Sequence, residues 1–179
     1  MSRLSKKPTS LPQGVSAEYK DFTLSVKGPK GELKRQFKDN ADIKIENNEV
    51  SVSIKTNSPR VSSVMSGTLV SHIRNMIKGV TDGFSKRLVI EGVGYKAEAQ
   101  GDKLKLIVGL SHPVMVSIPS GIKVSIEKNV IIVEGMDKEM VGQFAADVCA
   151  VKKVEPYKGY GIRYEGAFVR RKQGKRATA

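Results

Sequence analysis

With 179 residues and a hydrophobic fraction of 39%, the chain has room for one large domain or two small ones around a packed core, which excludes wholesale disorder. Its one cysteine, Cys149, excludes an internal disulfide and a cysteine-based zinc site, and no apolar run approaches the roughly 20 residues that a membrane helix needs. The formal net charge of +13 makes a polyanionic partner a candidate from the outset.

The N-terminal residues MSRLSKKPTSLPQG lack the apolar centre of a signal peptide, so we expect a protein that stays where it is made. Alternating apolar residues at Phe22, Leu24 and Val26, and again at 33–37, predict two strands joined by the turn GPKG at 28–31. Lys27 and Lys30 would project there, where glycines permit unusual backbone angles. A phosphate contact and a solvated hairpin end are both open interpretations of this turn.

The clearest predicted element is a helix that begins with Ser58 as N-cap and Pro59 at the first helical position. Apolar residues recur at helical spacing from Val61 and Val64 to position 80. Either of two glycines, at positions 79 and 83, can end the helix.

The second half repeats this order. Alternation predicts strands at 88–90, 104–108 and 114–118, and a second helix begins near Asp137 with a stripe from Met140 to Val151, stopped by Pro156. The segment IKIENNEVSVS (43–53) resembles VSIEKNVIIVEG (124–135), each a hairpin signal with a helix after it.

This repeat predicts an α+β protein of two tandem, duplicated small domains, each an antiparallel sheet covered by one helix, with a basic C-terminal extension. Glycine and aspartate cluster at 79–84, which indicates an N-terminal domain at 1–82 and a C-terminal domain at 83–179 that ends in a basic tail at about 157–179. We expect residues 1–82 and 83–155 to share one topology.

Reactive groups do not converge in the sequence, so we expect no enzyme, no cofactor, no metal and no small-molecule substrate. GPKGEL and EGVGYKAEAQG carry glycines but lead into strand patterns rather than a phosphate-binding helix N-terminus. Cys149 lies beside the apolar stripe of the second helix, as a small core residue would.

The charge gathers at the two ends. Residues 152–179 contain nine Lys or Arg and two Asp or Glu, whereas residues 81–151 contain eight and nine. KGYGIRY (158–164) alternates like a strand whose bare glycines let another backbone come close. Five Lys or Arg residues follow in residues 170–176. Arginine makes bidentate hydrogen bonds to phosphate, and tyrosine can stack on nucleic-acid bases. An anionic membrane surface is the alternative partner for these cations, but the sequence shows neither a basic amphipathic helix nor a lipidation signal. RNA or DNA is therefore the favoured partner.

The residues PYKGYGIRYEGAFVRRKQGK (156–175) resemble the C-terminal signature of the bacterial large-subunit ribosomal protein six family. GPKGEL, EGVGYKA, GLSHPV and the opening MSRLSKKP are similar to its other motifs, in matching order along the whole chain. Tyr160, where many members have lysine, and EGAF (165–168) depart from the pattern.

The resemblance implies two duplicated α+β domains, no catalysis and a cytoplasmic place in the ribosome. It implies binding to large-subunit (23S) ribosomal RNA near the stalk base and the elongation-factor site, beside neighbouring ribosomal proteins and, transiently, elongation factors. A free basic regulator that binds DNA or RNA off the ribosome, and an enzyme with an unrecognised site, are the alternatives.

The predicted RNA-binding residues are Lys153, Lys158, Gly159, Tyr160, Gly161, Arg163, Tyr164, Arg170, Arg171, Lys172, Lys175 and Arg176. A second, weaker set consists of Arg3, Lys6, Lys7, Lys27 and Lys30.

Overall fold

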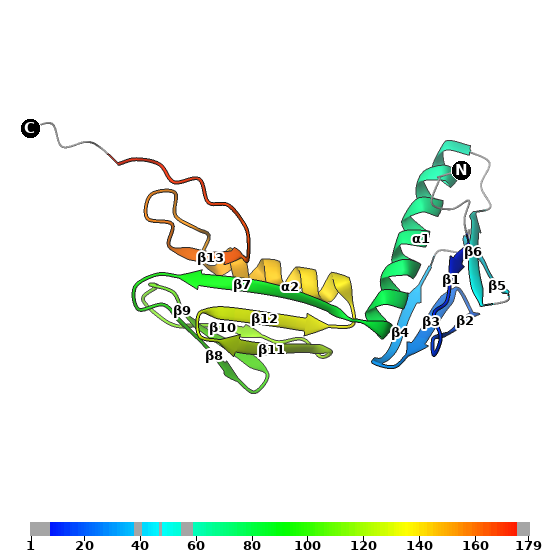
Figure 1. Ribbon diagram of the computed structural model, residues 1–179, viewed down its shortest axis with the longest axis horizontal. Helices are drawn as coiled ribbons and strands as arrows, with labels where there is room; N and C mark the ends of the chain where they lie inside the picture. Colours follow the sequence, from blue (N-terminus) through cyan, green and yellow to red (C-terminus); the bar gives the residue numbers. More distant parts are fainter. Residues whose placement is uncertain (1–7, 38–40, 47, 55–58, 175–179) are drawn as a thin grey trace, which may run out of the picture. The chain divides into compact units, whose positions relative to one another are not determined.

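The structure is a computed structural model that describes residues 8–37, 41–46, 48–54 and 59–174, with the side chains of 41, 54 and 59–64 left aside. It divides the chain into two compact units. The first comprises residues 1–84 with 136–138, and the second comprises 85–135 with 139–179. Each unit is α+β, with antiparallel strand pairs and one helix (Figure 1).

In its described residues the first unit runs through six strands into one helix. Its elements are β1 (Thr9–Ser10), β2 (Ser16–Lys20), β3 (Thr23–Gly28), β4 (Gly31–Gln36), β5 (Ala41–Glu46), β6 (Glu49–Ile54) and α1 (Pro59–Thr81). Hydrogen bonding orders the strands as two three-stranded sheets, β2-β3-β4 and β1-β6-β5. The predicted hairpin at 43–53 is β5 and β6, in which Ile43 pairs with Val52.

Helix α1 covers this unit because one stripe of its side chains is apolar. It begins at Pro59, as predicted, and packs against β3, β4 and β6. Ile73, Met76, Ile77 and Val80 are buried in one core with strand residues such as Leu24. The predicted N-cap Ser58 lies outside the described residues, as do the side chains of Val61 and Val64.

The end of α1 is set by Gly83, not by Gly79. Gly83 has a φ of +78°, and its amide donates to the carbonyl of Lys78 at 3.0 Å, which is how a left-handed glycine closes a helix. Gly79 lies inside the helix, where a Cβ would stand 2.1 Å from the Met136 carbonyl oxygen. Its role is therefore close packing.

Up to residue 174, where the described structure ends, the second unit has seven strands and one helix. They are β7 (Phe84–Glu91), β8 (Lys96–Gln100), β9 (Lys103–Ile107), β10 (Val114–Ser117), β11 (Ile122–Glu127), β12 (Val130–Gly135), α2 (Lys138–Val151) and β13 (Gly161–Tyr164). The sheets are β10-β9-β8 and β11-β12-β7-β13. Helix α2 buries Val141, Phe144, Ala145 and Val148. It ends at Val151, before Pro156, as predicted.

The two units share one topology, which confirms the predicted duplication. β7 corresponds to β1, the meander β8-β9-β10 to β2-β3-β4, and the hairpin β11-β12 to β5-β6. A backbone bond recurs with them. The Leu11 amide donates to the Asn48 carbonyl at 2.8 Å, and the Ile90 amide donates to the Asn129 carbonyl at 2.8 Å. Asn48 and Asn129 are the residues that the sequence repeat superposes.

Two predicted inward positions are wrong. Phe22 was expected to alternate with Leu24 and Val26, but it forms the β2–β3 turn with Asp21, has a φ of +58° and is 45% exposed. Met140 is predicted in the apolar stripe of α2, but it is the third residue of that helix and is 37% exposed. Leu24 and Val26 are fully buried, as predicted.

Candidate nucleic-acid interface

The predicted C-terminal motif folds as a loop that returns alongside a short strand. After α2 ends, the Glu155 amide donates to the Tyr160 carbonyl at 2.9 Å, and the Ile162 amide donates to the Lys152 carbonyl at 2.9 Å. Strand β13 then pairs antiparallel with β7, placing Ile162 opposite Ile90 and Gly161 opposite Glu91. Ile162 is buried, so this hydrophobic contact fixes the base of the motif.

Both predicted strand glycines lie against the chain itself. Gly161 has a φ of +148°, and a Cβ there would stand 2.7 Å from the Val154 Cα. Gly159 has a φ of +78°, and a Cβ would stand 2.8 Å from the Arg171 Nε. The close approach that the sequence predicted is therefore made by protein atoms, and a contact of either glycine with RNA stays a prediction.

One carboxylate joins two of the predicted arginines. The guanidinium of Arg163 donates to Oε1 of Glu91, and it also donates to the Ala167 carbonyl at 3.0 Å. Glu91 Oε2 lies 4.0 Å from Nη2 of Arg171. Arg163 and Glu91 meet because β13 and β7 are paired, which places them diagonally on one face of the sheet. Within the described residues, the buried Nε of Arg163 has no hydrogen-bond partner.

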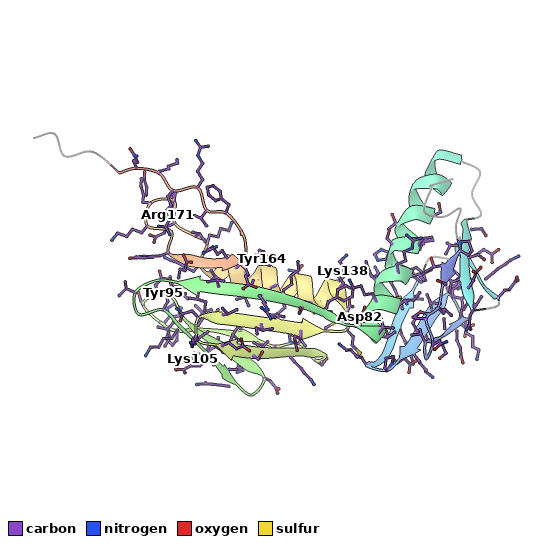
Figure 2. All side chains as sticks on the ribbon, viewed as in Figure 1. Asp82, Tyr95, Lys105, Lys138, Tyr164 and Arg171 are labelled. Atoms are coloured by element: carbon purple, nitrogen blue, oxygen red, sulfur yellow. The ribbon has the colours of Figure 1, made fainter. Side chains whose placement is uncertain are left out.

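Residues 165–172 run back over the loop instead of leaving the domain at once. The Glu165 amide donates to the Arg87 carbonyl at 2.9 Å, the Ala167 amide to the Tyr164 carbonyl at 3.1 Å, and the Lys172 amide to the Pro156 carbonyl at 2.7 Å. Figure 2 shows Arg171 in this segment, at the end of the sheet where β7 finishes and where Tyr95 also lies. We call residues 165–172 the return segment.

The remaining predicted cations of this region face solvent. Lys153, Lys158, Arg170 and Lys172 are exposed, and none of the four has an ion pair among the described residues. Ammonium and guanidinium groups in this state are free to replace the counterions of a nucleic-acid backbone.

Two exposed aromatic residues lie in the same stretch and were missing from the predicted set. Tyr157 is 59% exposed and Phe168 is 91% exposed. Flat apolar rings that face water beside cations are the groups on which unpaired bases stack. The sequence gives a signal for Phe168, since the residues two and three positions away are glycine, glutamate and arginine. It gives none for Tyr157, which has Val154 and Tyr160 at helical spacing.

The predicted tyrosines hold the loop together. Tyr160 meets Tyr95 edge to face, with ring centroids 6.5 Å apart and planes at 60°, and Lys158 Nζ lies 5.9 Å from the Tyr160 centroid. Tyr164 has Lys86 Nζ 5.7 Å from its centroid. Partial burial, and then the nearby Cys149, raise the pKa of Tyr164 above its usual value, so the phenol stays neutral.

The predicted GPKG turn is docked rather than free. Gly28 pairs with Gly31, whose φ is +145°, while Gly28 shows no such angle. The Lys30 amide donates to the Val80 carbonyl at 3.0 Å, and its ammonium donates to the Asp82 carbonyl. Lys30 therefore caps the C-terminal end of α1, where carbonyls and the helix dipole favour a cation. Lys27 Nζ lies 3.9 Å from Glu32.

Five predicted residues, Arg3, Lys6, Lys7, Lys175 and Arg176, lie outside the described residues. In the part of the chain that is described, no group of three His, Cys, Asp or Glu side chains could hold a metal ion. None of its helices is both long and apolar enough to cross a membrane. Burial raises the pKa of Cys149, which keeps the thiol protonated.

A duplicated α+β fold with exposed cations and aromatic rings at its C-terminal end defines a class of basic two-domain proteins suited to a polyanion. The family model for ribosomal protein L6 matches twice, at residues 11–83 and 91–165, one match in each repeat. The large ribosomal subunit protein uL6 of Listeria monocytogenes (strain HCC23) is 48% identical over 98% of both chains. That of Thermotoga maritima is 47% identical over 99% of this chain and all of its own, and uL6c of Guillardia theta is 47% identical over 98% of both.

This chain belongs to the ribosomal protein L6 family. The family resemblance of the sequence is therefore confirmed, and the protein is a ribosomal protein, not an enzyme.

Proposed function

We propose that the protein is a structural constituent of the large ribosomal subunit that binds 23S ribosomal RNA with residues 153–176. As a bacterial-type member of its family it works in the cytoplasm. The observation that carries the proposal is the cluster of Lys153, Lys158, Arg170 and Lys172, exposed and without ion pairs in the described structure, beside Tyr157 and Phe168. Phosphate neutralisation supplies the affinity of such a surface, and stacked rings hold unpaired bases.

In this proposal the interface binds the large subunit near the stalk base and the elongation-factor site. Neighbouring ribosomal proteins and, transiently, elongation factors are further partners there. Residues 1–82 and 83–179 are the two domains, and the second makes most of the contacts with RNA. Of the weaker set, Lys27 and Lys30 already have partners in the first unit, so their contribution to RNA binding is the smaller one.

Sedimentation of a cell lysate tests the assignment to the ribosome. The tagged protein is expected to co-migrate with the large subunit after a moderate salt wash. A protein found mainly at the top of the gradient would instead be a free nucleic-acid-binding regulator, and the proposal would be wrong.

A matched pair of variants tests the surface. Changing Lys153, Lys158, Arg170 and Lys172 to glutamine removes four charges from the proposed interface, and changing Lys96, Lys103, Lys123 and Lys128 removes four exposed charges from elsewhere in the second unit. On a 23S RNA transcript, the first variant should lose about 3 units of the slope of log affinity against log salt. If both variants lose the same amount of slope, RNA binding depends only on the net charge of the protein, and the proposed interface is wrong.

A further inference from the structure

Glu91 is an acidic residue that contacts two arginines of the proposed RNA interface, Arg163 and Arg171. It is the last residue of β7, lies opposite Gly161, and its side chain is 35% exposed. By Coulomb's law alone its negative charge repels RNA phosphates and weakens binding. An acid at this position can help the interface only through geometry.

The geometry is that of a two-sided anchor. One carboxylate oxygen accepts from Arg163 of β13, and the other lies 4.0 Å from Arg171 of the return segment. Arg163 also donates to the Ala167 carbonyl, which belongs to the return segment. The carboxylate thus links β7 to a distant part of the sequence, namely β13 and the return segment that follows it directly.

Two further contacts seat Arg171 and its neighbour. The Arg171 guanidinium covers Gly159 so closely that a Cβ would stand 2.8 Å from its Nε, and the Lys172 amide donates to the Pro156 carbonyl at 2.7 Å. The exposed cations Arg170 and Lys172 flank Arg171, so anchoring Arg171 holds in place the backbone from which both side chains extend. The other acids of the region are engaged elsewhere, Glu165 with Arg87 and Glu155 with Lys152.

We propose that Glu91 is a positioning residue of the RNA interface: it holds Arg163 and Arg171 and so docks the return segment in its binding geometry. This inference rests on the proposed function. Ordering a cation-bearing segment before RNA arrives removes part of the entropy cost of ordering it at binding.

The test compares Glu91→Gln with Glu98→Gln in the full chain, measuring affinity for a 23S RNA transcript. Each substitution removes one negative charge from the second unit, and Glu98 pairs with Lys105 on β9, away from the return segment. Glu98→Gln should leave affinity equal or slightly higher, as charge alone requires. Glu91→Gln should weaken binding by about threefold to tenfold, the cost of ordering one or two long side chains.

The opposite signs separate geometry from charge. If Glu91→Gln binds as tightly as the wild type or more tightly, the carboxylate has no positioning role and the inference is wrong. The proposed function survives that outcome as long as the wild type keeps its steep salt dependence. A wild type without salt-dependent RNA binding would remove the proposed function itself.

A double-variant cycle guards against simple loss of fold. In an Arg171→Gln background, Glu91→Gln should cost at most half of what it costs in the wild type, because one of the two anchored arginines is already gone. An undiminished cost in that background means that Glu91 acts through the stability of the domain, which would overturn the inference. Thermal melts of all four proteins should show changes too small to unfold any of them at the assay temperature.

Discussion

Gly161 lies where two stretches of backbone meet, and its lack of a side chain is what lets them do so. The Ile162 amide bonds to the Lys152 carbonyl, and the backbone of 153–154 fills the space that a Cβ at 161 would need. With a φ of +148°, the residue also occupies a conformation that is nearly restricted to glycine. The loop that carries Tyr157 and Lys158 depends on this contact.

We therefore expect Gly161→Ala to destabilise the second unit by about 2–4 kcal/mol, from backbone strain and overpacking together. Urea unfolding followed by tyrosine fluorescence measures this well, because the chain has no tryptophan and Tyr95, Tyr157, Tyr160 and Tyr164 all belong to the second unit. The matched control is Gly174→Ala, which has no atom within 4 Å and should change stability by less than about 0.5 kcal/mol. If both substitutions change stability by the same small amount, the loop can relax to accommodate a Cβ at residue 161 and the prediction is wrong.

At the scale of the element, helix α1 ends against the tip of a hairpin instead of in solvent. Lys30 supplies both a backbone and a side-chain donor to carbonyls at 80 and 82, and Gly28 is so near Val80 that a Cβ would stand 2.7 Å from its Cγ2. The turn is thus part of the helix cap, which neither sequence interpretation of GPKG included. Lys30 and Val80 are 50 residues apart, so the local sequence around the turn does not predict this contact.

Lys30→Glu should destabilise the first unit by about 1–2 kcal/mol, because it removes a donor from the last carbonyls and adds an anion to the negative end of the helix. Lys44→Glu on β5 is the control: it makes the same charge change on an exposed strand position. Circular dichroism during urea unfolding reports the difference. If Lys30→Glu leaves stability unchanged and costs several times more RNA affinity than Lys44→Glu, the phosphate interpretation of the turn is right.

Elements with strong periodicity could be predicted, and those without it could not. Alternation marked β9 through Leu104 and Leu106, which are fully buried, and Pro59 marked the start of α1. β2 (SAEYK) and β8 (KAEAQ) are polar strands at sheet edges, and the Asp21–Phe22 turn adopts positive φ without a glycine. Their sequence signals are weak: the strands alternate only alanine or tyrosine with polar residues, and Asp21 is the only typical turn residue at the Asp21–Phe22 turn.

At the scale of the whole molecule, the composition of the sequence predicts a binding surface, but it does not predict the contacts that hold that surface in place. The density of cations in 152–179 predicts a surface for a polyanion, since such a stretch cannot bury itself. The anchor of that surface, Glu91, is 72 residues away from Arg163 and becomes visible only once β13 pairs with β7. The family follows from motifs that span the chain, whereas the distribution of roles among the arginines follows from tertiary pairing.

Deleting residues 166–179 tests how the tail divides its work between grip and fold. The deletion removes Arg170, Arg171, Lys172, Lys175 and Arg176, and five phosphate contacts would contribute about 4 units to the slope of log affinity against log salt. The protein loses the Lys172–Pro156 backbone bond, the two hydrogen bonds that Ala167 makes with Tyr164 and Arg163, and the partly exposed Arg171–Glu91 pair. These contacts are few and lie at the surface, so stability should fall by only about 1–2 kcal/mol. Salt titration of RNA affinity, intact against truncated, and a melting curve of each decide between the roles. An unchanged slope with a collapsed melting temperature would make the tail a structural strap, and the RNA grip would have to lie elsewhere on the molecule.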